Sequence, residues 1–193
     1  MLHKCTLLLS AIIASALSPD IFSLQLYSIW MEQDKVFMNL ALKEAEEALK
    51  IDEVPVGCVV IRDLNSACEQ IHVQAGESRV IVKSHNLTNT LSDPLAHAEY
   101  LCVKMLIESK MPLDDLVFYI TLEPCAMCIG VLEKINAKVI FGYHNDIFGA
   151  RKILNKNCGK CVNDKRCVEI LKKFYETPNK STDHLRKAVY PTK

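Results

Sequence analysis

Two short motifs constrain most strongly what this sequence can fold into. Residues 96–99 read Ala-His-Ala-Glu, and residues 123–128 read Glu-Pro-Cys-Ala-Met-Cys. Histidine and cysteine are preferred zinc ligands, and His97, Cys125 and Cys128 together supply three of them. Three protein ligands leave the fourth tetrahedral position open for water, as a catalytic rather than a structural zinc requires. The sequence therefore predicts a fold that brings both motifs to one Zn²⁺ per chain.

The spacing within each motif has a physical reason. Two cysteines separated by two residues at a helix start direct their sulfurs toward one point, where the helix dipole favours thiolates. Glu99 is two residues from His97, so it can lie near the metal without being a ligand and can take a proton from zinc-bound water. A lone Cys-x-x-Cys is often structural and a lone histidine is often only packed. Their combination with Glu99 and Pro124 matches the signature of zinc enzymes that deaminate nucleobases.

Strands alternate with helices along the chain. Apolar residues that recur every three or four positions predict an amphipathic helix over residues 32–50. Further helices are predicted over residues 96–109, 125–136 and 167–175, and strands over residues 58–61, 79–83, 116–121 and 138–142. Residues 62–78 have no clean period and are interpreted as an inserted loop. This order predicts an α/β fold with some parallel strand pairing.

Charge is unevenly distributed, although Lys plus Arg and Asp plus Glu both total 23. Residues 151–193 hold 12 basic and four acidic side chains, a net charge of +8, so residues 1–150 carry −8. A basic tail on an acidic body can bind a polyanion through electrostatic attraction. A tail that is only solvated would have the same sequence pattern.

Nine cysteines are an odd number in a chain too large to need a disulfide framework, so reduced thiols and metal binding fit better. Cys158, Cys161 and Cys167 suggest a second metal site, but unpaired thiols are the favoured interpretation because no fourth ligand is obvious. Cys58 and Cys102 lie in apolar runs and are expected to pack in the core.

The first 30 residues resemble a secretory signal, because Lys4 precedes an apolar run over residues 7–17 and residues 14–16 read Ala-Ser-Ala. The globular pattern begins abruptly at Met31, and a thiolate zinc site suits a reducing compartment. We therefore interpret residues 1–30 as an extension that arises from a misassigned start, and expect a cytoplasmic or nuclear protein. The run is too short to cross a membrane. The expected organisation is this extension, a zinc deaminase domain over residues 31–150, and a basic helix and tail over residues 151–193.

Through these motifs the sequence resembles the tRNA-specific adenosine deaminases, which convert the wobble adenosine of the anticodon to inosine. The resemblance covers about residues 32–149. It rests on residues 53–57 (Glu-Val-Pro-Val-Gly), on Asn86, on residues 93–99 (Asp-Pro-Leu-Ala-His-Ala-Glu) and on residues 121–128 (Thr-Leu-Glu-Pro-Cys-Ala-Met-Cys). It implies a cytidine-deaminase-like, three-layer α/β/α fold with a central mixed sheet. An insertion over residues 64–76 departs from the family pattern.

The resemblance also implies roles for single residues. Asn86 would contact the target nucleoside, the backbone of Pro55, Val56 and Gly57 would wall the base pocket, and Glu99 would shuttle the proton while zinc-bound hydroxide attacks the adenine. Candidates for tRNA phosphate contacts are Lys172, Lys173, Arg186 and Lys187, for which a solvated face is the alternative. Tyr143, Phe148 and Tyr175 are candidates for stacking on bases, with core packing as the alternative.

The sequence allows more than one partner subunit and more than one substrate. The end of the chain resembles that of the eukaryotic catalytic subunit, which pairs with a homologous non-catalytic subunit, whereas residues 148–151 (Phe-Gly-Ala-Arg) resemble the homodimeric bacterial enzyme. The main alternative function is deamination of a free base or nucleotide such as cytosine, guanine or deoxycytidylate. A non-catalytic subunit is the other alternative, but the shuttle carboxylate is typically replaced in such subunits and Glu99 is present here.

Overall fold

The computed structural model describes residues 19–63 and 79–176, with side chains from residue 32 onward. The inserted loop, the first 18 residues and the tail that includes Arg186 and Lys187 lie outside these ranges. The chain divides into two compact units with the boundary between Lys35 and Val36. No helix in the described ranges is both long and apolar enough to cross a membrane.

The first unit contributes the beginning of helix α2, which spans Pro19–Lys50. The helix predicted over residues 32–50 is present, but it begins earlier than the sequence pattern indicated. No glycine or proline interrupts the chain between Pro19 and Pro55, and a proline at the first helical position is compatible with a helix start. On its surface Lys35 Nζ lies 3.3 Å from Glu32 Oε2.

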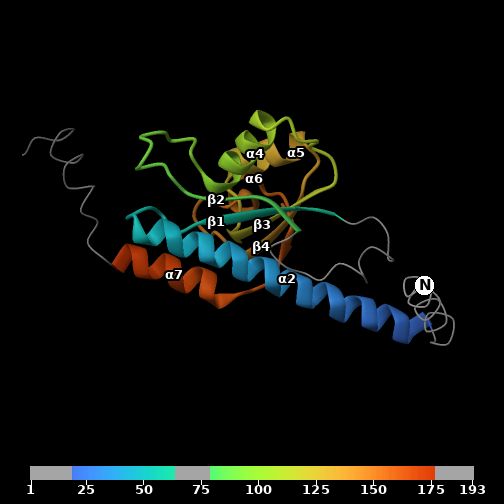
Figure 1. Cartoon of the computed structure of the whole chain (residues 1–193). Coiled ribbons are helices and arrows are strands. Elements are labelled where there is room, and N and C mark those ends of the chain that lie inside the picture. The colour runs from blue at the N-terminus through green and yellow to red at the C-terminus, as the bar shows by residue number, and fades with distance from the viewer. Residues whose placement is uncertain (1–18, 64–78, 177–193) are drawn as a thin grey trace, which may run out of the picture. The chain divides into compact units, whose positions relative to one another are not determined.

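The second unit is built on a five-stranded sheet (Figure 1). Its strands, in the order β2-β1-β3-β4-β5, are Val80–His85, Gly57–Arg62, Leu116–Leu122, Lys138–Tyr143 and Lys160–Cys161. Strand β1 is antiparallel to β2 and β3, whereas β4 is parallel to β3 and β5. The expectation of a mixed sheet is confirmed. The two-residue strand β5 has no periodic signal in the sequence and was not predicted.

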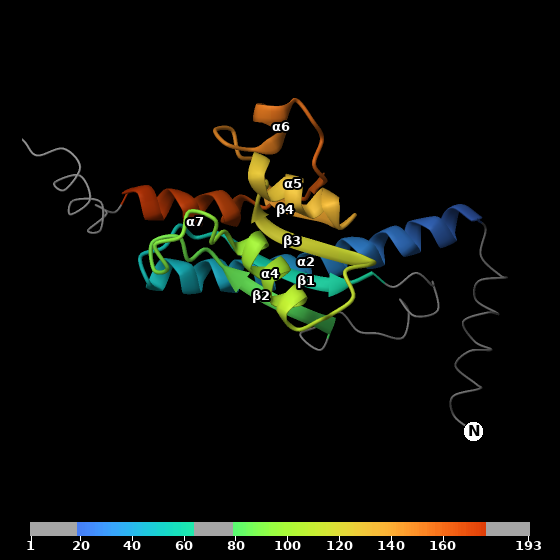
Figure 2. The same ribbon diagram turned by 90° about the horizontal axis from the view of Figure 1, so that it is seen from above.

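Helices cover both faces of this sheet. Helices α4 (Ala98–Glu108) and α5 (Ala126–Lys134) lie on one face, and α7 (Lys165–Glu176) lies with the later part of α2 on the other (Figure 1). The view from above shows α4 and α5 over the sheet, with the short helix α6 (Ala150–Leu154) following β4 (Figure 2). Helix α6 was not predicted. The arrangement confirms the three-layer α/β/α fold.

Alternating residues of the strands face two separate cores. On one side Val60, Phe118 and Phe141 pack with Cys102 of α4 and Leu132 of α5. The neighbouring residues point the other way, and that second core is formed by residues of α2, α7 and the sheet: Phe37, Ala41, Val59, Tyr119, Ile140 and Ile170. Because both faces are buried, the central strands read as continuous apolar runs. The packing of Cys58 and Cys102, both without solvent exposure, is as expected.

Candidate metal centre and active site

The two predicted metal motifs meet at the starts of two helices. His97 caps the N-terminus of α4 and Cys125 caps that of α5, and both have extended backbone dihedrals. The chain leaves a strand or loop in extended form and turns into the helix at these residues, so their side chains project beyond the helix ends. Cys128 lies in the first turn of α5 and is buried. His97 was expected within the first turn of α4, and it lies just before it.

The three side chains form a group with the dimensions of a zinc site. Both Cys125 Sγ and Cys128 Sγ face His97 Nδ1, at 3.6 and 3.5 Å. Tetrahedral bonds of about 2.3 Å to sulfur and about 2.1 Å to nitrogen would place ligand atoms about 3.6 Å apart. All three candidate ligand atoms lie within 4.8 Å of one another, and no other such group occurs among the described residues. The donor set therefore fits a zinc ion.

The electrostatics of the group favour binding of a cation. A hydrogen bond from Cys128 lowers the pKa of the Cys125 thiol to about 4, and the hydrogen bond to Cys125 in turn raises the pKa of Cys128. The hydrogen bond with Cys125 also raises the pKa of His97. Without a cation, two sulfurs and an imidazole in this space must share protons. A divalent cation replaces those protons, in keeping with the proton release that accompanies metal binding.

Glu99 lies beside this group on the first turn of α4, and its side chain is 4% exposed. Burial raises the pKa of Glu99 to about 6. A carboxyl group that changes protonation state near neutral pH is suited to taking up and delivering a proton. Glu99 is not a member of the group formed by His97, Cys125 and Cys128, and it lines the same cavity as His97 and Cys125.

A cavity of about 450 Å³ opens over Glu99, His97 and Cys125. Asn86 and Val56 line the same cavity, so the structure brings these two predicted binding residues to the metal group. Such a volume lies in the range of small-molecule sites.

Two other predicted wall residues, Pro55 and Gly57, are buried and do not line the cavity. Gly57 faces α2 instead, where a Cβ would contact the Ala41 carbonyl oxygen and lie 2.6 Å from Ala45 N. Val54 takes part in the wall in their place. Lining and non-lining residues thus alternate along residues 54–57, which lead into β1.

The mouth of the cavity is aromatic and apolar. Ile147 and Phe148, in the loop after β4, and Tyr175 on α7 line it while remaining 69%, 66% and 68% exposed. Phe148 and Tyr175 thus lie where they could stack on a ligand, whereas Tyr143 packs against the core formed by α2, α7 and the sheet. Lys172 and Lys173 lie on α7 beside the cavity-lining residue Leu171, and both are exposed.

Glu123 connects the metal motif to the loop that forms this mouth. Its side chain is fully buried and accepts hydrogen bonds from the backbone N–H groups of Asn145 and Arg151, at 3.1 and 2.9 Å, and from His144 Nδ1 at 3.1 Å. Burial acts against the charged form, but the hydrogen bonds from Arg151, His144 and Asn145 outweigh it and hold the pKa of Glu123 below its usual value. Glu123 is therefore the anchor of residues 144–151.

Sequence reasoning did not identify several cavity residues, among them Thr88, Asn145, Ile147 and Leu171. They come from three separate loops and helices and carry no motif of their own. One sequence signal could have indicated the loop after β4, namely Glu123 directly before Pro124. A glutamate between an apolar strand and a metal motif is expected to be buried, and a buried carboxylate needs hydrogen-bond donors from another segment.

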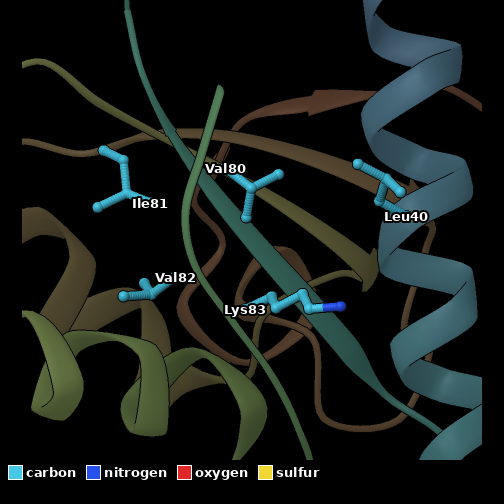
Figure 3. Close-up of a pocket in the computed structure, with 5 residues that line it drawn as sticks. All are labelled: Leu40, Val80, Ile81, Val82 and Lys83. Carbon is cyan, nitrogen blue, oxygen red and sulfur yellow. The ribbon is translucent and has the colours of Figure 1, made fainter. Parts of the chain in front are cut away.

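Two other histidines and three further cysteines lie outside the metal group. His85 Nδ1 lies 3.0 Å from Glu44, and His144 contacts Glu123, so neither histidine joins the metal group. Cys158, Cys161 and Cys167 form no disulfide, and Cys158 Sγ donates to Glu123 Oε1 at 3.7 Å. A second cavity, of about 300 Å³, lies between Leu40 of α2 and residues 80–83 of β2 (Figure 3). It offers apolar side chains and the ammonium group of Lys83, which is paired with Glu44 at 3.0 Å.

Comparisons with known proteins agree with this geometry. The chain is 27% identical to tRNA-specific adenosine deaminase 2 of Xenopus tropicalis over 180 residues, which are 81% of this chain and 98% of that protein. It is 34% identical over 121 residues to the chloroplastic tRNA(adenine(34)) deaminase of Arabidopsis thaliana, covering 61% of this chain but only 8% of that much longer protein.

A solved structure from a study of A-to-I editing by tRNA deaminases at the wobble position superposes with a TM-score of 0.55 and 28% identity, covering 69% of this chain and 97% of that one. The family model of the cytidine and deoxycytidylate deaminase zinc-binding region matches residues 31–143, the part that carries both metal motifs. This chain belongs to that family of zinc-dependent deaminases.

Proposed function

We propose that the protein converts adenosine to inosine at the wobble position of tRNA anticodons by hydrolytic deamination. The observation that carries this proposal is that Glu99, His97 and Cys125 open into one cavity with an aromatic mouth. The relatives named above, which are tRNA adenosine deaminases, support the choice of substrate. An anticodon loop presents unpaired bases, so a single adenine can enter such a cavity without the melting of a long duplex.

His97, Cys125 and Cys128 are the residues that would hold the zinc. When bound, zinc lowers the pKa of water from 15.7 to about 7 and so supplies a nucleophile at neutral pH. The residues of this chain hold and move the proton. The Glu99 carboxylate accepts a proton from the attacking water and delivers it to ring nitrogen 1 of the adenine. It then takes the proton of the new hydroxyl group on carbon 6 and passes it to the exocyclic amine, which leaves as ammonia while the carbonyl group forms.

The surroundings of Glu99 support this role. Its side chain is almost fully buried at the start of α4, which limits the access of bulk water to the carboxyl group. Asn86, whose backbone N–H donates to the Val56 carbonyl, lines the same cavity and would hold the nucleoside. Phe148 and Tyr175 at the mouth would stack on neighbouring unpaired bases.

Binding of the rest of the tRNA would use the basic end of the chain. Lys172 and Lys173 are exposed on α7 next to the mouth, and Arg186 and Lys187 follow in the tail outside the described residues. With a net charge of +8 over residues 151–193, this part of the chain is suited to phosphates. The expected signature is a steep loss of tRNA affinity with increasing salt.

The active form is proposed to be a dimer, either with a homologous non-catalytic subunit or with a second copy of this chain. Exposed apolar side chains after β4 and on α6, among them Ile147, Ile153 and Leu154, offer surface for such a contact. We place the enzyme in the cytoplasm or nucleus, where its tRNA substrate and reduced thiols are both available.

The test uses zinc-loaded protein, alone and with a candidate partner subunit, and a tRNA transcript that carries adenosine at position 34. Inosine should form at that position, and a Glu99→Gln variant that retains zinc and tRNA binding should lose about 10²- to 10⁴-fold in rate. A Glu108→Gln variant, changed at the exposed end of the same helix, is the control and should edit normally.

The alternative is deamination of a free base or nucleotide, because the metal group and Glu99 suit that chemistry equally. Turnover of guanine, cytosine or deoxycytidylate without editing of tRNA, alone and with the partner, would overturn the tRNA assignment while keeping the deaminase chemistry.

A further inference from the structure

Asn86 is held at the edge of the cavity by one backbone and one side-chain hydrogen bond. Its backbone N–H donates to the Val56 carbonyl at 3.0 Å, and its side-chain Nδ2 donates to Thr88 Oγ1 at 3.0 Å. Its side-chain carbonyl oxygen Oδ1 has no hydrogen-bond partner among the described residues. Because Asn86 and Thr88 both line the cavity, that oxygen is available to a ligand.

Thr88 is in turn bound to a carboxylate. Its hydroxyl donates to Glu53 Oε2 at 3.4 Å, and Glu53 Oε1 accepts the backbone N–H of Thr90 at 2.5 Å. Glu53 has no solvent exposure. Carboxylate oxygens accept hydrogen bonds, and a threonine hydroxyl has a single hydrogen to donate. The hydroxyl of Thr88 therefore donates its one hydrogen to Glu53, so its oxygen can only accept a hydrogen bond from Asn86.

This directionality decides how the Asn86 amide is turned. An amide has a donor end and an acceptor end of nearly the same shape, and its hydrogen-bond network selects between the two orientations. A Thr88 oxygen that can only accept requires the NH₂ end of Asn86. The opposite orientation would bring two acceptors together and leave the NH₂ end facing the cavity.

We propose that Glu53, acting through Thr88, is a positioning residue that turns the Asn86 amide so that its carbonyl oxygen faces the cavity. The site then selects a ligand with an N–H or O–H donor at that point, and this part rests on the proposed nucleoside function. The ring nitrogens of adenine at positions 1, 3 and 7 only accept, so they do not satisfy this oxygen. In a polynucleotide the remaining donors are the ribose 2′-hydroxyl and the exocyclic amine.

Kinetics on the full-length, zinc-loaded enzyme test the positioning role. Thr88→Val keeps the shape but removes the hydroxyl, and Thr88→Ser keeps the hydroxyl. We expect Thr88→Val to raise KM about tenfold with kcat within about threefold, as for one lost binding hydrogen bond, and Thr88→Ser to stay near wild type. Combining Thr88→Val with Asn86→Ala should be no worse than Asn86→Ala alone, because Thr88 acts through Asn86. Full additivity would overturn the proposal.

Glu53→Gln tests the origin of the directionality. A glutamine can accept from Thr90 N–H with its oxygen and donate to Thr88 with its NH₂ group, which lets the Thr88 hydroxyl donate to Asn86 and turns the amide around. We expect the same increase in KM as for Thr88→Val. A Glu53→Gln enzyme with wild-type KM would overturn the proposal, and the Thr88 pair keeps it testable should Glu53→Gln fail to fold.

A spectroscopic measurement separates this inference from the proposed function. The side-chain NH₂ resonances of Asn86, assigned by their loss in Asn86→Ala, should shift in Thr88→Val and Glu53→Gln but not in Thr88→Ser. Unchanged resonances in the first two variants would contradict the network even if tRNA is edited. If wild-type enzyme does not edit tRNA, the proposed function fails while this measurement still decides the orientation of the amide.

A tRNA with deoxyadenosine at position 34 identifies the donor on the ligand. If the 2′-hydroxyl is the partner, Thr88→Val and wild type should have the same KM for this tRNA. If the exocyclic amine is the partner, the tenfold difference should persist.

Discussion

Cys128 Sγ lies 3.5 Å from His97 Nδ1, although Cys128 is in α5, His97 caps α4, and a strand separates their motifs. Two helix N-termini, each with a positive dipole end, converge at this contact. A cation is stable there only if thiolates neutralise it. The pairing of two cysteines with one histidine therefore follows from the electrostatics of the fold as well as from the preferences of zinc.

Metal content should depend on the group His97, Cys125 and Cys128 and on no other cysteine. We expect wild-type protein to contain about one zinc per chain, and His97→Ala and Cys128→Ser to lose it, because two remaining ligands do not hold zinc in competition with water. Cys161→Ser, changed at a half-buried thiol of β5, is the matched control. Elemental analysis by mass spectrometry measures the stoichiometry, and full zinc content in Cys128→Ser would contradict the ligand assignment.

Glu123→Ala should destabilise the fold strongly. The change removes the buried carboxylate that accepts the backbone N–H groups of Asn145 and Arg151, so we expect a loss of about 2 to 4 kcal/mol in the free energy of unfolding. Glu133→Ala is the control, because that residue forms only an exposed ion pair with Lys156 and should change stability by less than about 0.5 kcal/mol. Urea unfolding measures both. Equal effects of the two changes would mean that Glu123 does not anchor the loop.

Two glycine substitutions should change the free energy of unfolding in opposite directions. Gly57→Ala places a methyl group against the Ala41 carbonyl oxygen and 2.6 Å from Ala45 N, both of them backbone atoms of α2, so we expect a loss of more than about 2 kcal/mol. Gly130→Ala lies in the interior of α5 with nothing within 4 Å of the new Cβ, and should stabilise by about 0.5 to 1 kcal/mol. Thermal unfolding of the two variants beside wild type checks the prediction, and a neutral Gly57→Ala would contradict the close approach of β1 and α2.

Asp164 should give a small stabilisation that disappears in acid. Its carboxylate accepts hydrogen bonds from Arg166 Nε at 3.0 Å and Arg166 N at 3.1 Å, and the side-chain bond with Arg166 lowers the pKa of Asp164 below its usual 3.8. A carboxylate with a lowered pKa in the folded state contributes stability above its unfolded-state pKa, and that contribution is lost as pH falls through the folded-state pKa.

The ion pair with Arg166 is partly exposed, so the contribution at pH 7 should be below about 1 kcal/mol. Asp164→Asn should therefore be slightly less stable than wild type at pH 7 and pH 5, with the difference closing below about pH 3.8. Urea unfolding at several pH values is the measurement. A difference that grows toward acid would show that Arg166 does not hold the charged form.

Much of this protein was predictable from local sequence. The strands around Val59 and Phe118 and the helices that begin next to His97 and Cys125 were expected because apolar periodicity is a local property of the chain. The metal group was predictable for the same reason. Cys125 and Cys128 are three residues apart, and His97 is followed two residues later by the carboxylate of Glu99. Residue type and these short spacings are enough to indicate the ligands.

Other features depended on contacts between distant segments. Strand β5 exists because β4 offers it a pairing edge. The close approach of Gly57 to Ala41 and Ala45 of α2 is likewise a contact between distant segments.

The sequence by itself determined the metal chemistry and the order of elements, because both rest on residue identity and on spacings of a few residues. Only the tertiary structure decided which side chains surround the ligand. The Glu53–Thr88–Asn86 chain and the anchoring of residues 144–151 by Glu123 join groups that are far apart in sequence. Hydrogen-bond direction is a property of such assembled networks, and no local pattern encodes it.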